Sequence, residues 1–170
     1  MTDRASAPFR ILVLCTGNSA RSQMAEALIN ARGEGRIVAE SAGSEPAAAV
    51  NPLAIETLGQ AGIVWRGHPP RSIDGLVDHP WDAVITVCDK AREACPIFPG
   101  HPIMAHWGMP DPASVDGGDA ERRRAFRDAL VLLQRRVDLM LALPIESLQR
   151  MALEARLKAI GGTGPAAATA

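Results

Sequence analysis

The sequence lacks the features of several large protein classes. Its 170 residues include no tyrosine and only three each of tryptophan and phenylalanine, and the net charge is -1. A chain without excess positive charge has no overall charge that would attract nucleic acid or an anionic membrane surface. No apolar run approaches the ~18 residues of a membrane span, and the N-terminal residues lack the apolar core of a secretory signal. We therefore expect a cytoplasmic protein that binds neither nucleic acid nor membranes.

Cysteine is also scarce. The chain has three, Cys15, Cys88 and Cys95. An odd number in a chain of this kind argues against a disulfide scaffold and leaves core thiols, metal ligands or redox chemistry. The interval between Cys88 and Cys95 is not the short C-x2-C of zinc sites, and the four histidines form no ligand pattern. We predict no metal site and no cofactor.

Apolar segments and amphipathic helical segments alternate along the chain. Short apolar runs typical of buried parallel strands occupy residues 10–15, 36–43, 82–88 and 102–107. Helical patterns begin near residue 20, at the Asn51-Pro52 cap with Gly62 beyond its end, and at Asp119. Such alternation predicts an α/β fold: a three-layer single domain with a four-stranded parallel sheet flanked by helices.

Pro144 divides the C-terminal part of the chain. We expect the main domain in residues 1–143, an additional amphipathic helix in 144–160 and a disordered tail in 161–170. The apolar stripe of that helix is predicted to dock on the core or on a second copy of the chain, and it contains Leu148, Met151, Ala152 and Ala155.

The segment CTGNSARS joins the first strand to the first helix. Cys15 ends the strand, and Arg21 stands at the mouth of the helix. Ligands of parallel α/β sheets bind beyond the carboxyl ends of the strands, where loop amides and the helix dipole attract anions. The same positive field is expected to lower the pKa of Cys15, and Ser22 is expected to donate to its thiolate. The alternative is a core thiol beside a surface arginine.

This segment resembles the C-x5-R-[ST] loop of the low-molecular-weight protein tyrosine phosphatases and of the arsenate reductases that share their fold. The resemblance extends from about Phe9 to Leu143 and implies the same four-stranded sheet. It makes 1–143 a catalytic domain in which Cys15 is the nucleophile. The implied substrate-binding residues are Thr16, Gly17, Asn18, Ser19, Ala20, Arg21 and Ser22.

The dipeptide Asp111-Pro112 corresponds to the general acid of this family. Its carboxylic acid is expected to protonate the departing oxygen, although Asp-Pro is also common in ordinary turns. The phosphatases usually place an aromatic residue next, which lines the phosphotyrosine site. This chain has Ala113 there and no tyrosine anywhere, which disfavours a tyrosine phosphatase.

Cys88 and Cys95 carry a further resemblance. Cys88 ends a predicted strand of the same sheet as Cys15, so both can reach the same crevice. If the residues between Cys88 and Cys95 were helical, the two would lie about 10 Å apart along the axis. A disulfide needs Cα atoms within about 7 Å, so pairing would require unwinding. The alternative is two structural thiols. The spacing, with proline after the second cysteine, resembles the thioredoxin-coupled arsenate reductases.

The resemblance implies reduction of arsenate to arsenite for arsenic detoxification. Cys15 attacks arsenic, Cys88 attacks Cys15, and Cys95 attacks Cys88 to leave a disulfide that thioredoxin reduces. Phosphate and sulfate are expected to compete with arsenate, and glutathione or mycothiol are alternative donors. The second reading is a phosphatase that forms a cysteinyl-phosphate, and the third is a regulatory module without turnover. We expect a monomer or a weak homodimer through the C-terminal helix.

Some members of this family bind a potassium ion near the catalytic loop. Their asparagine, glutamate and serine ligands match Asn18, Glu26 and Ser41. A further aspartate ligand aligns with Pro70 or Arg71, and we expect the arginine guanidinium to replace the ion. We therefore predict no essential potassium.

Overall fold

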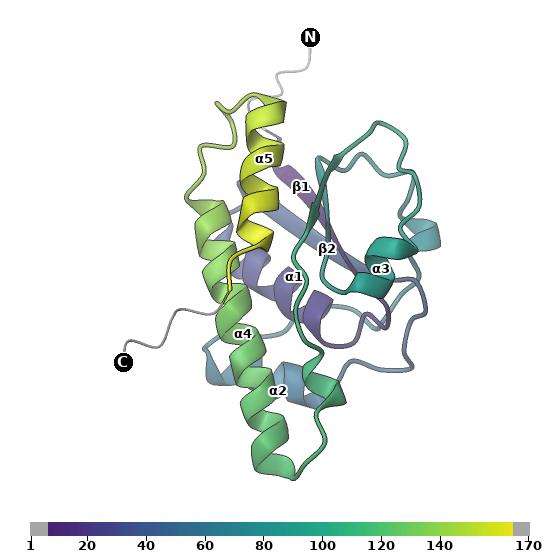
Figure 1. The fold of residues 1–170 in the computed structure, drawn as a ribbon, viewed down its shortest axis with the longest axis vertical. Coiled ribbons are helices and arrows are strands. Elements are labelled where there is room, and N and C mark those ends of the chain that lie inside the picture. Colours follow the sequence, from purple (N-terminus) through teal and green to yellow (C-terminus); the bar gives the residue numbers. More distant parts are fainter. Residues whose placement is uncertain (1–6, 165–170) are drawn as a thin grey trace.

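The computed structural model describes residues 7–164 of the chain. Its strands and helices are β1 (Phe9–Cys15), α1 (Arg21–Arg32), β2 (Ile37–Gly43), α2 (Pro52–Gln60), β3 (Ala83–Thr86), α3 (Asp89–Glu93), β4 (Ile103–His106), α4 (Asp119–Leu141) and α5 (Arg150–Gly161). Short 3₁₀ turns occupy Ile73–Gly75 and Pro112–Ser114. Figure 1 shows these elements, with the sheet surrounded by the helices.

The four strands form one parallel sheet in the order β2-β1-β3-β4. The central strand β1 is buried from Ile11 to Cys15, as expected for a parallel strand covered on both faces. The chain passes from β1 to β2 on one side and then crosses to β3 on the other. The carboxyl ends of β1 and β3 therefore flank the topological switch point, where α/β sheets bind ligands. The predicted fold class is confirmed.

Local signals set the helix boundaries. The Asn51 side chain accepts a hydrogen bond from the Leu53 amide at 2.9 Å, and Pro52 occupies the first helical position of α2. Gly62 follows the helix with a φ of 80°, which glycine adopts without a steric penalty. The predicted capped helix is thus confirmed. Helices α1, α2 and α4 contact one another beside the sheet.

The strand β3 is shorter than the predicted range 82–88. Pairing with β1 ends at Thr86, and Val87 adds one more bond through its amide to the Leu14 carbonyl at 2.9 Å. The chain then leaves the sheet because Cys88 caps α3, its side chain accepting from the Ala91 amide. This departure turns Cys88 toward the switch point.

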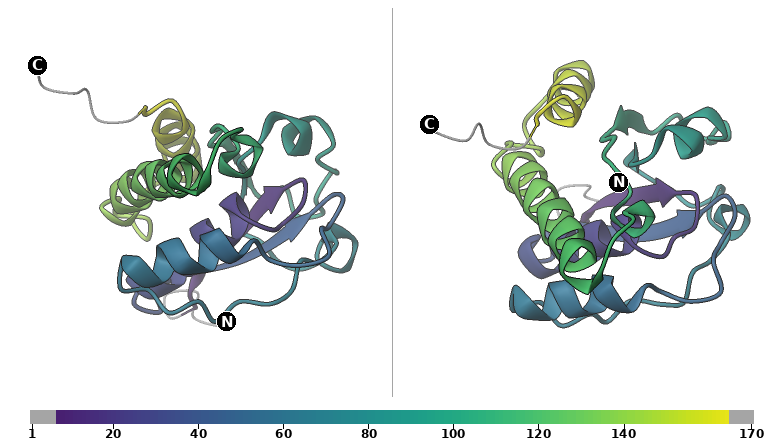
Figure 2. Two further views of the ribbon diagram at one scale, coloured as in Figure 1. Left: turned by 90° about the horizontal axis from the view of Figure 1, so that it is seen from below. Right: turned by 60° about the horizontal axis from the view of Figure 1, so that its bottom comes forward.

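Helix α5 packs against β4 and α4, and Figures 1 and 2 show it beside α4. It begins at Arg150 because the residues after Pro144 form turns instead. The predicted stripe is wrong at three of its four positions: Met151 is 84% exposed, and Ala152 and Ala155 also face solvent, while Leu148 packs against the core. The buried face of α5 is formed by larger side chains, those of Leu153, Leu157 and Ile160. Each buried side chain contributes about 1.5–3 kcal/mol.

The end of α5 extends past the predicted boundary of the tail. Gly161 closes the helix, and the Thr163 carbonyl accepts hydrogen bonds from Arg136. The ordered chain therefore continues beyond residue 161, while 165–170 lie outside the described residues. In the described part of the chain, no helix combines the length and the apolar character needed to cross a bilayer.

Candidate active site

The loop of residues 16–20 lies at the switch point, between Cys15 at the end of β1 and Arg21 at the start of α1. The carbonyl groups of this loop point toward the neighbouring segment 44–51. Those of residues 15, 16, 17 and 19 accept hydrogen bonds of 2.8–3.3 Å from amides in the segment 44–51. Within residues 7–164, no backbone carbonyl accepts from the amides of residues 17–21. Amides without backbone acceptors beside a helix N-terminus are suited to binding an oxyanion.

Asn18 holds the loop in its curled form. Its φ is 51°, in the left-handed region that asparagine tolerates better than most residues. The side chain is buried and donates to the hydroxyls of Ser22 and Ser41 at 2.9 Å each, while it accepts from the Arg71 amide at 3.1 Å. Gly43 leaves room for the loop, since a Cβ there would lie 2.4 Å from the Thr16 carbonyl oxygen.

Arg21 is 9% exposed, so the expectation of an ordinary surface arginine is excluded. One terminal nitrogen donates to the Met109 carbonyl at 3.0 Å, and the other lies 3.6 Å from the Asp111 carboxylate. Its Nε is buried and has no partner among the described residues. A buried donor without an acceptor is costly, and a bound oxyanion would satisfy it.

We expect Arg21→Lys to weaken phosphate binding about 30-fold, which corresponds to roughly 2 kcal/mol. Lysine keeps the charge but loses the planar fork that reaches Met109 and the anion together. Calorimetric titration with phosphate measures the effect. The control is Arg32→Lys on the same helix, whose surface ion pair with Asp138 lies outside the loop. Equal affinities for the wild type and Arg21→Lys would contradict this role.

Cys15 and Cys88 meet at the floor of the loop. Both thiols are buried, and Cys88 Sγ lies 3.2 Å from the hydroxyl of Thr16, the residue after Cys15, and 3.4 Å from the Ala91 amide. The hydrogen bond with Cys15, followed by those from Thr16 and Ala91, lowers the pKa of Cys88 to about 5. The bond to Cys88 and burial raise the pKa of Cys15, although Arg21 opposes the rise.

The predicted low pKa of Cys15 is therefore wrong, because Cys88 and burial raise it. The two sulfurs share one proton, and the negative charge rests on Cys88 because Cys88 receives more donors. Ser22 does not donate to Cys15 as predicted: its hydroxyl accepts from Asn18 instead. Sequence reasoning missed this arrangement because it treated Cys15 without its neighbour across the sheet.

A titration tests the shared proton. Because the pKa of Cys88 is lowered to about 5, its thiolate is present at neutral pH and is lost as the pH falls through about 5. We expect the ultraviolet absorbance of one thiolate per molecule to titrate with that midpoint. Cys95→Ser should leave the curve unchanged, since burial raises the pKa of Cys95. A first thiolate that appears only near the ordinary pKa of ~8.5 would contradict the arrangement.

Cys95 lies at the other end of α3, and all three cysteines are reduced. The helix has only five residues, of which Ala91 alone is buried, so little packing opposes its unwinding. Exposed polar contacts hold it, including the ion pair of Lys90 with Glu45 at 3.2 Å. Cys95 lines a cavity of about 320 Å³ between β4 and α5, which gives the segment room to rearrange.

Asp111 caps a turn and also faces Arg21. Its carboxylate caps the following turn by accepting from the Ala113 amide and the Ser114 hydroxyl, at 3.0 Å each. It also faces Arg21, so it lies within reach of an anion that Arg21 holds. Ala113 is exposed and offers no aromatic wall.

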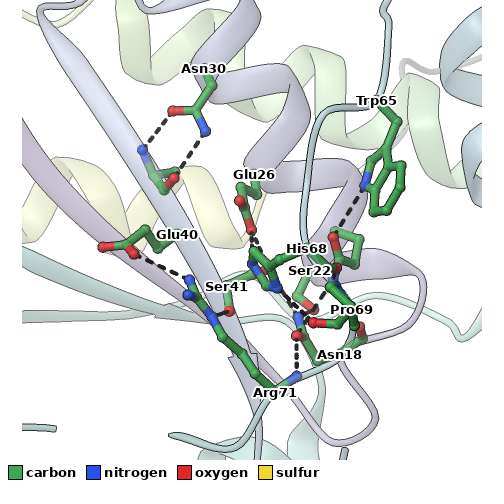
Figure 3. Close-up of polar contacts among 12 residues, drawn as sticks. Asn18, Ser22, Glu26, Asn30, Glu40, Ser41, Trp65, His68, Pro69 and Arg71 are labelled. Atoms are coloured by element: carbon green, nitrogen blue, oxygen red, sulfur yellow. Dashed lines mark hydrogen bonds and ion pairs between the residues drawn. The ribbon is translucent and has the colours of Figure 1, made fainter. Parts of the chain in front are cut away.

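The position matching the family's cation site is filled by protein groups (Figure 3). Glu26 accepts from the Ser41 hydroxyl and bonds His68 Nε2 at 3.1 Å. The predicted replacement by the Arg71 guanidinium is wrong, because that group donates to the Ser41 carbonyl and Glu40. His68 faces Glu26 instead, and sequence reasoning missed it because a lone histidine carried no pattern.

Oxygen atoms already engaged by protein donors do not fit a potassium ion, so we assign none to this network. Asn18 Oδ1 accepts from the Arg71 amide, and Glu26 accepts from Ser41 and His68. Residues 7–164 also contain no cluster of three or more histidine, cysteine or acidic side chains arranged to hold a metal.

Several known proteins are similar to this chain in sequence and in fold. The model of the low molecular weight phosphotyrosine protein phosphatase family matches residues 10–154. An arsenate reductase of Bacillus licheniformis is 39% identical over 117 residues, which cover 69% of this chain and 84% of that protein. The structure of an arsenate reductase from Archaeoglobus fulgidus has a TM-score of 0.62 and 32% identity, and the match covers 78% of this chain and 99% of that one.

A thioredoxin-dependent arsenate reductase from Corynebacterium glutamicum is also similar. Its structure has a TM-score of 0.57 and 27% identity, and the match covers 79% of this chain and 64% of that one. The family match spans β1, the oxyanion loop, all three cysteines and α4. The chain therefore belongs to the low molecular weight phosphotyrosine protein phosphatase family.

Proposed function

We propose that this chain is an arsenate reductase that converts arsenate to arsenite through three cysteines and is regenerated by thioredoxin. One observation carries the proposal: Cys88 Sγ lies 3.2 Å from the hydroxyl of Thr16, the residue after Cys15 in the oxyanion loop, and Cys95 lies just beyond the short helix that Cys88 caps. A phosphatase needs the loop and its first cysteine but neither of the other two. The arsenate reductase relatives support the same choice.

The first step uses the loop. Arsenate is a tetrahedral oxyanion, which the amides of residues 17–21 and the unpartnered Nε of Arg21 bind. The shared proton passes to Cys88 as the Cys15 sulfur attacks arsenic. An arsenic–oxygen bond breaks, and protonated Asp111 donates to the departing oxygen so that it leaves as water.

The second step transfers two electrons. Cys88, protonated in the first step, releases its proton to solvent, which its lowered pKa of about 5 favours. Its thiolate then attacks the Cys15 sulfur, the sulfur–arsenic bond breaks, and the electron pair of that bond remains on arsenic. Arsenite leaves, and a Cys15–Cys88 disulfide forms. The Thr16 hydroxyl at 3.2 Å and the Ala91 amide at 3.4 Å stabilise the attacking thiolate.

The third step frees the loop. The Cys95 thiolate attacks Cys88, which releases Cys15 as a thiolate and leaves a Cys88–Cys95 disulfide. We expect α3 to unwind first, since a helical path over residues 88–95 would place the two cysteines about 10 Å apart along the axis, beyond disulfide distance. The dithiol of thioredoxin then reduces this disulfide and is itself oxidised. We place the reaction in the cytoplasm, where the thioredoxin system keeps thiols reduced.

The test is arsenate-dependent NADPH oxidation in the presence of thioredoxin and thioredoxin reductase, run in parallel with aryl phosphate hydrolysis. We expect many turnovers with arsenate, inhibition by phosphate and sulfate, and at most slow hydrolysis of the ester. Aryl phosphate hydrolysis without arsenate turnover, unchanged by the loss of Cys88 and Cys95, would establish the phosphatase instead. Oxyanion binding without turnover of either substrate would indicate a regulatory module.

A further inference from the structure

One buried cation connects the C-terminal helix α5 to the loop that follows β4. Arg136 of α4 is 3% exposed. Its guanidinium donates to the carbonyls of Trp107 at 2.8 Å and Gly108 at 3.1 Å in that loop. It also donates to the carbonyls of Gly161 at 3.2 Å and Thr163 at 3.1 and 3.2 Å, at the end of α5. A single side chain therefore joins the two segments.

The bonds of Arg136 are specific to a guanidinium. No carboxylate among residues 7–164 lies within ion-pair distance of it, so carbonyl oxygens alone compensate the buried charge. Burying a charge is costly unless its hydrogen bonds are made. The planar fork distributes donors to both segments at once, which the three donors of a lysine ammonium cannot reproduce.

Two further contacts draw α5 against the end of β4. The Trp107 indole donates to the Leu157 carbonyl at 3.1 Å. A Cβ built on Gly161 would lie 2.0 Å from the His106 carbonyl oxygen, so only glycine permits this approach. The family model ends at residue 154, before Leu157, Gly161 and the other end of the Arg136 bridge.

The loop that Arg136 binds continues into the candidate active site at its next residue. Arg136 binds the Gly108 carbonyl, and Arg21 binds the next one, that of Met109, at 3.0 Å. Asp111 follows, 3.6 Å from Arg21. Two arginines therefore bind the carbonyls of successive residues. Arg136 connects the loop to the end of α5, and Arg21 connects it to the oxyanion loop.

We propose that Arg136 is a positioning residue: by clamping residues 107 and 108 to the end of α5, it keeps Asp111 within reach of an oxyanion held by Arg21. The role of α5 is then to brace the loop of the acid. The inference rests on the proposed function for the part that Asp111 plays, whereas the clamp itself can be measured without any reaction.

The test compares Arg136→Met and Gly161→Ala with the control Arg135→Met, an exposed arginine on the same helix. We measure the rate at which arsenate oxidises the cysteines in a single turnover. Both test variants are expected to lower this rate about tenfold while the affinity for phosphate changes less than twofold. The control should match the wild type.

A double-mutant cycle separates positioning from general destabilisation. In an Asp111→Asn background, we expect Arg136→Met to cause no further loss, because the group it positions is gone. Multiplied losses, or unchanged single-turnover rates in Arg136→Met and Gly161→Ala, would overturn the proposal. If Arg136→Met does not fold, Gly161→Ala breaks the same approach while keeping the guanidinium and runs through the same cycle.

Hydrogen exchange distinguishes failure of the clamp from failure of the proposed function. The amides of residues 107–111 are expected to exchange about tenfold faster in Gly161→Ala than in Arg135→Met. If the wild type did not turn over arsenate, the proposed function would be contradicted. Faster exchange of the amides of residues 107–111 in Gly161→Ala would still support the clamp in that case. If these amides exchanged at the same rate in Gly161→Ala as in Arg135→Met, the clamp would be overturned, whatever the activity of the enzyme.

Discussion

Replacing Cys15 with serine is expected to abolish arsenate reduction, lowering turnover by about 10⁴-fold or more. A serine hydroxyl keeps the size of the side chain but is not ionised at neutral pH, so it offers arsenic no comparable nucleophile. The amides of residues 17–21 and Arg21 remain, since their hydrogen bonds do not involve the Cys15 sulfur. The loop should therefore still bind phosphate while the chemistry stops.

Arsenite formation and phosphate affinity, measured on the same preparations of Cys15→Ser, separate these two effects. A matched control is Cys95→Ser, which should retain a single round of arsenite release. If Cys15→Ser kept more than a few per cent of wild-type turnover, Cys15 would not be the nucleophile. In that case Cys88, whose pKa is lowered to about 5, would be the next candidate.

Cys88→Ser should show the second large effect. The first attack on arsenic uses Cys15, Arg21 and Asp111, but release of arsenite requires a second thiolate to take the Cys15 sulfur. We expect arsenite formation to fall about 10³-fold or more, with slow aryl phosphate hydrolysis preserved. Arsenite detection and counting of free thiols after arsenate exposure would measure this.

Alkylation of Cys15 gives an independent readout in the same variant. The hydrogen bond with Cys88 is the main cause that raises the pKa of Cys15, so its loss should lower that pKa. At neutral pH, Cys15 should then react faster with iodoacetamide in Cys88→Ser than in the wild type. Rapid arsenite release from Cys88→Ser, or an unchanged rate of Cys15 alkylation, would contradict the placement of the two thiols.

Much of this architecture is predictable because its signals are local. The apolar run ending at Cys15 specifies a buried strand, and Asn51-Pro52 with Gly62 brackets a helix. The oxyanion loop follows from small residues between a strand and a helix. These features depend on neighbours in the chain, and the structure reproduces them.

The differences arise where distant segments meet. The direction of the Cys15 pKa shift depends on Cys88, which follows β3, and the partner of Glu26 is His68 from a loop beyond α2. The buried face of α5 depended on which side chains β4 accepts, so the stripe containing Met151 was wrong. The Arg136 bridge joins three segments and leaves no local pattern.

The most direct measurement of the proposed relay is the number of arsenate molecules that Cys95→Ser reduces with thioredoxin, thioredoxin reductase and NADPH present. The relay predicts many turnovers for the wild type and about one per molecule for the variant, which stops as a Cys15–Cys88 disulfide. Mass spectrometry of tryptic peptides would identify that bond. Sustained turnover by Cys95→Ser at the wild-type rate would contradict the three-cysteine relay and leave Cys95 a bystander.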